Sequence, residues 1–138
     1  MTLRPALDPG RGQHYNPYAK GVTAMDADLD VKIRRMGDIP VLDLTGDIDG
    51  YTCIKLRDAI IELLEAGDRK VVISMAKVSY IDSSGLGTLV GGLRRINEHD
   101  GGLALSGAGP QIRKVLSITG LSKVFSVFND ETEAIRSL

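Results

Sequence analysis

The sequence predicts a single α/β domain, in which a mixed, mostly parallel β-sheet packs with about four α-helices and follows a flexible N-terminal tail. Two observations predict this class. Segments with the apolar pattern of strands alternate along the chain with segments whose apolar residues recur at helical spacing. The chain has 138 residues, of which 43% are hydrophobic, enough for a single core.

The beginning of the chain differs from the rest. Residues 1–25 contain several prolines and glycines without a periodic apolar pattern, which indicates an extension that is disordered or loosely docked. They lack the apolar region of a secretory signal, and no stretch approaches the ~20 apolar residues of a membrane span. We therefore expect one domain over residues 26–138, in the cytoplasm and without a membrane span.

A β-hairpin is expected over residues 28–46. Leu29, Val31 and Ile33 alternate with charged residues, the pattern of a strand with one buried face. A Gly-Asp pair then turns the chain into a second strand with the sequence IPVLDLTG. This antiparallel pair makes the predicted sheet mixed.

An amphipathic helix and a buried strand come next. In YTCIKLRDAIIELLEAG the apolar residues have helical spacing, Gly67 suits the position after the helix end, and Asp49 is a candidate N-cap. KVVISM is a short apolar run, typical of a strand that is covered on both faces.

The second half of the chain repeats this alternation. The helix after SSGLG contains Gly91 and Gly92, which we interpret as a close-packing face. GGLALSG predicts a strand, and the next helix begins at Pro110 and ends at Gly120. VFSVF is a last short strand, and Asn129 is expected to cap a final helix. This order calls for parallel strands with right-handed crossovers.

Composition excludes several classes of function. Lysine and arginine number 17 against 18 acidic residues, so the net charge of −1 gives no basic excess for nucleic-acid binding. Cys53 is the only cysteine, which excludes a disulfide framework and a cysteine-based zinc site. No phosphate-binding loop motif appears. The sequence therefore gives no sign of a nucleic-acid ligand, a cysteine-based metal site or a nucleotide-binding loop.

The stretch VSYIDSSGLGTLVGGLRRI, residues 78–96, places an acid and two serines, Ser83 and Ser84, at the start of a helix. A serine nucleophile needs a base within hydrogen-bonding reach. His14 lies in the tail, and His99 lies at the far end of the same helix, roughly 20 Å or more away. The G-x-S-x-G elbow is also missing. A lysine or carboxylate base remains formally open.

Two other interpretations of this turn stay open. A serine or aspartate before a helix accepts a hydrogen bond from an unpaired N–H, typically worth ~1 kcal/mol, which explains one of the three polar residues. The positive end of a helix also tolerates a phosphoserine, with its charge of roughly −1.5 to −2, so the turn could be a modification site.

The same residues carry a family resemblance. VSYIDSSGLGTLVGGLRRI resembles the STAS domains of bacterial anti-anti-sigma factors, whose signature is Asp, Ser, Ser or Thr, and Gly-Leu-Gly at a strand-to-helix turn. LTGDIDGYTCIKLRDAI resembles the second strand and first helix of that family, and PQIRKVLSITGLSKVF its later helix and turn. The resemblance covers residues 28–138 and implies a single STAS domain.

This resemblance implies an anti-sigma factor antagonist, which is a protein-binding protein and not an enzyme. We expect it to have no cofactor, no metal and no direct nucleic-acid contact. The unphosphorylated protein would bind an anti-sigma factor that is also a serine kinase, and so release a sigma factor. The kinase would phosphorylate the first serine, Ser83, and the complex would dissociate. A PP2C-type phosphatase would reset the switch.

The resemblance also implies roles for individual residues. Asp82 would shape the turn, and Ser84 would act as a cap or turn stabiliser. The acidic turn with Asp47 and Asp49 would lie beside Ser83. The predicted partner-binding residues are Asp47, Asp49, Asp82, Ser84, Gly85, Leu86 and Gly87.

Two alternatives remain. Ser74 stands where the family often has an acid near the end of the third strand, which leaves the partner of this subfamily open. STAS domains also serve in other signalling complexes, so a module with this fold could control another output, through a phosphatase, a cyclase or a transporter-associated complex. A serine hydrolase is the third hypothesis, weakened by the positions of the two histidines.

Overall fold

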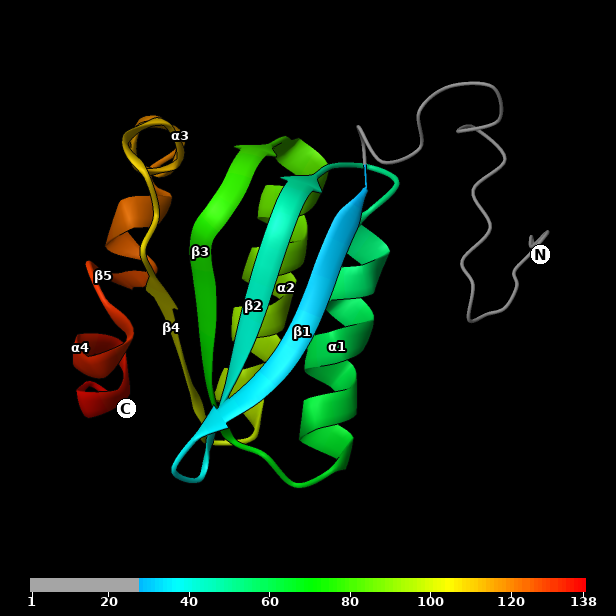
Figure 1. Ribbon diagram of the computed structural model, residues 1–138, viewed down its shortest axis with the longest axis vertical. Helices are drawn as coiled ribbons and strands as arrows, with labels where there is room; N and C mark the ends of the chain where they lie inside the picture. Colours follow the sequence, from blue (N-terminus) through cyan, green and yellow to red (C-terminus); the bar gives the residue numbers. More distant parts are fainter. Residues whose placement is uncertain (1–27) are drawn as a thin grey trace, which may run out of the picture.

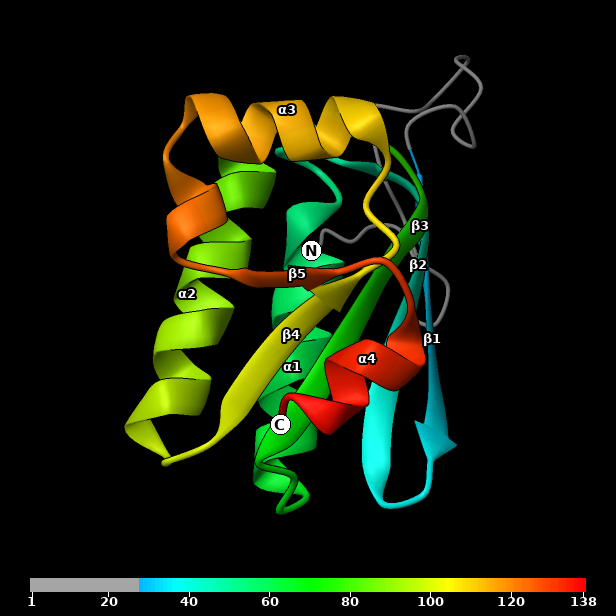
Figure 2. The same ribbon diagram turned by 90° about the vertical axis from the view of Figure 1, so that its left-hand side faces the viewer.

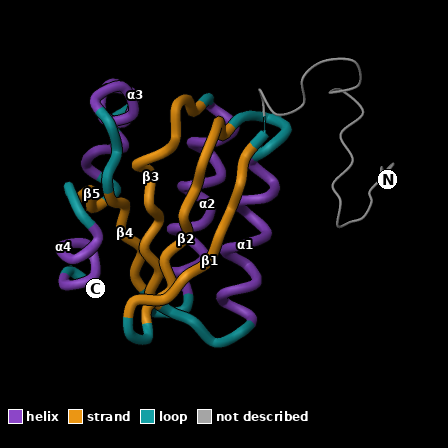
Figure 3. Tube along the Cα trace, viewed as in Figure 1, coloured by secondary structure: helices purple, strands orange, loops and turns teal. Residues whose placement is uncertain are grey.

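The computed structural model describes residues 28–138, so the prediction of a flexible tail over residues 1–25 lies outside the described residues. The described part is a five-stranded sheet with helices on both sides (Figures 1 and 3). Its strands are β1 (Leu29–Met36), β2 (Ile39–Ile48), β3 (Lys70–Ile81), β4 (Gly102–Ser106) and β5 (Ser126–Phe128). Its helices are α1 (Cys53–Glu65), α2 (Ser83–Glu98), α3 (Pro110–Ile118) and α4 (Glu131–Arg136), with a 3-10 turn at Leu121–Lys123.

The sheet has the mixed, mostly parallel character that the sequence predicts. Its strand order is β1-β2-β3-β4-β5; β1 pairs with β2 antiparallel, and the other neighbours are parallel. The hairpin is confirmed, with Leu29 opposite Gly46 and Met36 opposite Ile39. Ile33, however, is 46% exposed. The buried face of β1 therefore ends after Val31.

An apolar layer covers each face of the sheet. Helices α1 and α2 pack on one face, and α4 packs on the other (Figures 1 and 2). Strand β3 runs between the layers, so its residues Val71–Met75 are buried on both faces, as KVVISM predicts. The strand is longer than that run and reaches Ile81. Helix α3 lies across the end of the sheet where β2 and β3 finish (Figure 2).

Two predicted helix ends can be compared with the structure. After α1, Gly67 has a φ of +101°, and the N–H groups of Gly67 and Asp68 donate to the carbonyls of Leu64 and Leu63. This is the glycine-terminated helix end that the sequence predicts. The prediction for α4 is wrong by one residue. Its N-cap is Asp130, which accepts a 2.9 Å hydrogen bond from Glu133 N–H, whereas the neighbouring Asn129 accepts one from Arg113.

The Gly-Gly pair in α2 serves helix packing at one position only. A Cβ atom on Gly92 would lie 2.6 Å from Cδ1 of Ile60 on α1, so the two helices touch at this point. A Cβ on Gly91 would meet nothing within 4 Å. The predicted close-packing face is therefore confirmed for Gly92, with α1 as its partner element, and is wrong for Gly91.

Candidate functional site

Two turns meet at the carboxyl ends of β2 and β3. Ile48 and Ile81 are paired in the parallel register, and Asp82 N–H donates a 3.1 Å hydrogen bond to the Ile48 carbonyl. A Cβ atom on Gly50 would lie 3.7 Å from Ser84 Oγ, so the turn before α1 touches the turn before α2. The structure thus brings the acidic turn and the two serines together, at the edge of the sheet where the side chains after parallel strands converge.

Asp82, and not a serine, caps α2. Its backbone is extended, with φ −104° and ψ −173°, and its carboxylate accepts a 3.0 Å hydrogen bond from Gly85 N–H. Ser84 is the second residue of the helix, is exposed, and its hydroxyl makes no hydrogen bond with any residue that the structure describes. The interpretation of Ser84 as a cap or turn stabiliser is therefore wrong, because the aspartate already fills that role.

Ser83 is the first residue of α2. Its side chain is exposed, and its hydroxyl makes no hydrogen bond within residues 28–138. The side chain therefore has no structural task in this part of the molecule. A group attached to Ser83 Oγ would extend into solvent beside the N-terminal turn of the helix, where unpaired N–H groups favour negative charge.

The three residues of the Gly-Leu-Gly segment differ in how deeply they are buried. Gly85 is buried, and a Cβ there would lie 2.8 Å from the Ile48 carbonyl oxygen and 2.7 Å from Cγ1 of Ile81. Leu86 is half-buried and packs against the main core. Gly87 is exposed, and a Cβ on it would meet nothing within 4 Å. Helix packing therefore accounts for the first glycine, and only the second presents a surface.

The acidic turn is stabilised by its own hydrogen bonds. The Asp49 carboxylate accepts from Tyr51 N–H at 2.9 Å and from Thr52 N–H at 3.0 Å. Thr52, which is 4% exposed, donates its hydroxyl to the Asp47 carbonyl at 2.7 Å and accepts from Asp49 N–H. The N-cap position of α1 is Thr52 and not Asp49, so that prediction is wrong; the Asp49 side chain caps the turn before the helix instead. The sequence pattern that indicates this turn is an aspartate followed three residues later by a threonine, Asp49 and Thr52.

The structure adds nothing to the hydrolase hypothesis. His99 is the C-cap residue of α2 and contacts the Arg95 carbonyl at 2.8 Å. Ser83 begins the same helix, about 24 Å away along its axis at 1.5 Å per residue. His14 lies outside the described residues. Within residues 28–138 no group of three or more metal-ligating side chains is found, and none of the helices there is both long and apolar enough to cross a membrane.

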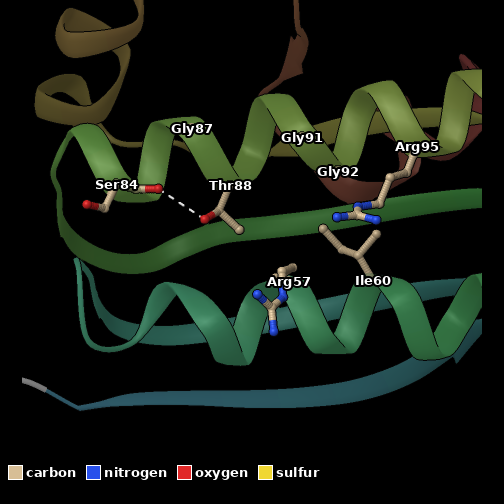
Figure 4. Close-up of a pocket in the computed structure, with 8 residues that line it drawn as sticks. All are labelled: Arg57, Ile60, Ser84, Gly87, Thr88, Gly91, Gly92 and Arg95. Carbon is tan, nitrogen blue, oxygen red and sulfur yellow. Dashed lines mark hydrogen bonds between the residues drawn. The ribbon is translucent and has the colours of Figure 1, made fainter.

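A groove lies between α1 and α2, which the sequence patterns did not predict. It has a volume of about 230 Å³ and begins at Ser84, next to the serine turn (Figure 4). Two arginines, two hydroxyl residues and several glycines line it: Arg57, Ile60, Ser84, Gly87, Thr88, Gly91, Gly92 and Arg95. Small or polar residues recur every three or four positions from Ser84 to Arg95. This spacing places them on one face of α2, and it is the sequence pattern that indicates the groove.

These features define a small α/β domain that presents a free serine at a strand-to-helix turn, beside an acidic turn. Comparison with known proteins identifies the family of this domain. Residues 30–134 match the STAS domain family, to which the chain belongs. A relative from Staphylococcus epidermidis, named anti-sigma-B factor antagonist, is 32% identical over 105 residues, covering 76% of this chain and 96% of the relative.

Solved structures share the fold. An anti-sigma factor antagonist from Mycobacterium paratuberculosis superposes with a TM-score of 0.72 at 23% identity, over 79% of this chain and 92% of that chain. The Bacillus cell fate determinant SpoIIAA in its phosphorylated form superposes with a TM-score of 0.62 at 24% identity, over 78% and 98%. The family match confirms the predicted family, and these superpositions confirm the predicted fold class.

Proposed function

We propose that this chain is an anti-sigma factor antagonist that binds an anti-sigma factor with serine kinase activity and is switched off by phosphorylation of Ser83. Binding releases the sigma factor, and phosphorylation ends binding. A PP2C-type phosphatase regenerates the active form. In this proposal the chain acts in the cytoplasm as a binding protein and catalyses no reaction itself.

The observation that carries the proposal is the state of the Ser83 hydroxyl. It is exposed at the first position of α2, while the capping role that would have explained a serine belongs to Asp82. A kinase can therefore reach Ser83 without opening the core. Similarity to relatives named anti-sigma-B factor antagonist supports the same function. It also favours control of transcription over the alternative outputs of a STAS module.

Electrostatics explain how one phosphate could end binding. The modification adds a charge of roughly −1.5 to −2. This charge would lie next to Asp82 and near the turn that holds Asp47 and Asp49. In the free protein it is solvated, and the helix N-terminus stabilises it by about 0.3–1 kcal/mol. Buried in a complex without a matching cation, it would cost on the order of 3–5 kcal/mol, roughly a hundredfold or more in affinity.

Phosphopeptide mapping tests the site. The full chain is incubated with ATP and the anti-sigma factor kinase of the same organism. One phosphate is expected on Ser83, retained in Ser84→Ala and absent in Ser83→Ala. The two variants are matched because both serines are exposed and adjacent at the start of α2. A phosphate on Ser84 alone would overturn the site assignment but leave the switch intact.

Calorimetry tests the function itself. Wild type and Ser83→Ala should bind the kinase tightly, Ser83→Asp more weakly because it carries about half the charge of a phosphate, and phosphorylated Ser83 most weakly. ATP should release wild type but not Ser83→Ala. If the unphosphorylated chain did not bind the kinase, or if the phosphorylated chain bound as tightly, the proposed function would be wrong.

A further inference from the structure

The groove between α1 and α2 has a chemical character of its own. Two of its lining residues are arginines, Arg57 from α1 and Arg95 from α2, and none of the residues that line it is acidic. Two more, Ser84 and Thr88, carry hydroxyls. In Figure 4 the Arg95 side chain extends from α2 toward Ile60 on α1. The groove therefore offers positive charge and hydrogen-bond donors to an anionic group.

The nearby carboxylates leave these cations accessible. Arg57 contacts Asp58 at 3.0 Å on the helix surface, but both side chains are about half exposed, at 48% and 54%. Such an exposed pair is weak and exchanges readily. Arg95 forms no ion pair with a residue that the structure describes. Glu65 and Glu98 line the adjoining hollow toward the C-terminal end of α2, which Arg95 also borders. The acidic residues thus border the adjoining hollow and not the groove itself.

The spacing of the arginines indicates what kind of anion fits. Arg57 precedes Ile60 by one turn of α1, and Arg95 follows Gly92 by one turn of α2. Ile60 and Gly92 are in contact, and the two helices run in the same direction (Figure 4). The arginine Cα atoms are therefore offset by about 9 Å along the groove, at 1.5 Å per residue. Alternate side chains of an extended peptide lie about 7 Å apart, within reach of two such flexible cations.

A single phosphate fits this groove less well than a peptide. Phosphate sites on helices use free N–H groups at the N-terminus. The groove begins at Ser84 in the first turn of α2, but most of it lies farther along the helix, where Gly87, Gly91 and Gly92 have their N–H groups inside the helix. The open space above Gly87 and Gly91, where a Cβ would meet nothing within 4 Å, suits a chain laid along the helices.

We propose that the groove between α1 and α2 is a docking site for an acidic segment of a protein partner, which places carboxylates against Arg57 and Arg95. The groove begins at Ser84, so a partner bound at the serine turn can continue into it. The site does not require phosphorylation of Ser83, and the proposal stands whether or not the function proposed above is correct.

The test uses the full chain and a fluorescent peptide of alternating glutamate and alanine, with a peptide of alternating glutamine and alanine as the uncharged control. Fluorescence anisotropy should show binding of the glutamate peptide only. Arg57→Gln and Arg95→Gln should each weaken binding about threefold, and the double variant about tenfold, as expected for exposed ion pairs. Amide resonances of Gly87, Gly91 and Gly92 should shift on titration.

Two variants separate the groove from general electrostatics. Arg94→Gln makes the same change in charge next to Arg95, but Arg94 does not line the groove, so it should leave the affinity unchanged. Gly91→Gln keeps the charge and fills the open space, so it should abolish binding; glutamine also favours the helix. Thermal unfolding curves of all variants should show that each remains folded.

Three results would overturn the proposal. One is equal binding of the glutamate and glutamine peptides to wild type. Another is an equal loss of affinity in Arg94→Gln and Arg95→Gln, which would indicate non-specific attraction. The third is pyrophosphate binding that depends on Arg57 and Arg95 and is tighter than peptide binding, which would make the groove a site for small phosphate ligands.

Discussion

The two glycines of the Gly-Leu-Gly segment should respond oppositely to the same substitution. A Cβ on Gly85 would lie 2.7 Å from Ile81 Cγ1, 2.8 Å from Ile48 Cγ2 and 2.8 Å from the Ile48 carbonyl oxygen. Favourable contacts between carbon atoms are about 3.5–4.0 Å, so all three neighbours would have to move. The carbonyl is fixed, because it belongs to β2 and accepts the hydrogen bond from Asp82 N–H. Gly87, two residues later, faces open space.

The expected magnitudes follow from this geometry. Overpacking costs about 1–3 kcal/mol, and three short contacts place Gly85→Ala near the upper value. Alanine gains up to about 1 kcal/mol over glycine in a helix. We therefore expect Gly85→Ala to lower the free energy of unfolding by about 2 kcal/mol and Gly87→Ala to raise it by up to about 1 kcal/mol. Both add the same atom to the same helix, so effects on the unfolded chain largely cancel between them.

Urea unfolding followed by far-UV circular dichroism measures both values. The difference of about 3 kcal/mol corresponds to roughly 10 °C or more in Tm for a domain of this size. If Gly85→Ala proved as stable as Gly87→Ala, the close packing of α2 against Ile48 and Ile81 would be wrong, and with it the packing explanation of the first glycine in the motif.

Three further predictions concern the cap, the pH dependence and the phosphorylated form. Asp82→Ala should destabilise the protein by about 1 kcal/mol in urea unfolding, because Gly85 N–H loses its acceptor, whereas Asp82→Asn should cost much less; equal losses would contradict the capping role. The hydrogen bond and charge of Arg35 lower the pKa of Asp68. That contribution to stability is complete above the unfolded pKa of about 3.9 and is lost as the pH falls through the lower folded pKa. The stability difference between wild type and Arg35→Gln should therefore shrink below about pH 4, and a difference independent of pH would refute this. Phosphorylation of Ser83 should leave the far-UV circular dichroism spectrum unchanged, because the side chain lies outside the core; a large loss of helical signal would mean that the switch melts α2.

Much of the fold was predictable because it depends on local patterns. The alternation of Leu29 and Val31 predicts the first strand, the continuous apolar run in KVVISM predicts a strand buried on both faces, and Gly67 marks the end of α1. The Asp-Ser-Ser-Gly-Leu-Gly motif likewise indicates both the family and the start of α2. Each of these features is decided within a few residues, by side-chain periodicity or by the backbone freedom of glycine.

Only the tertiary structure decided what each residue of the site does. Three polar residues in a row can each cap a helix, and the path of β3 into α2 selects Asp82, which leaves Ser83 and Ser84 exposed. The two glycines of the motif look equivalent in sequence, yet the Ile48 carbonyl of a neighbouring strand closes the space beside Gly85 alone. Arg57 and Arg95 are far apart along the chain, and the contact of α1 with α2 at Gly92 is what places them in one groove. These roles depend on distances between elements, which local sequence patterns do not contain, because they arise when the helices pack together on the sheet.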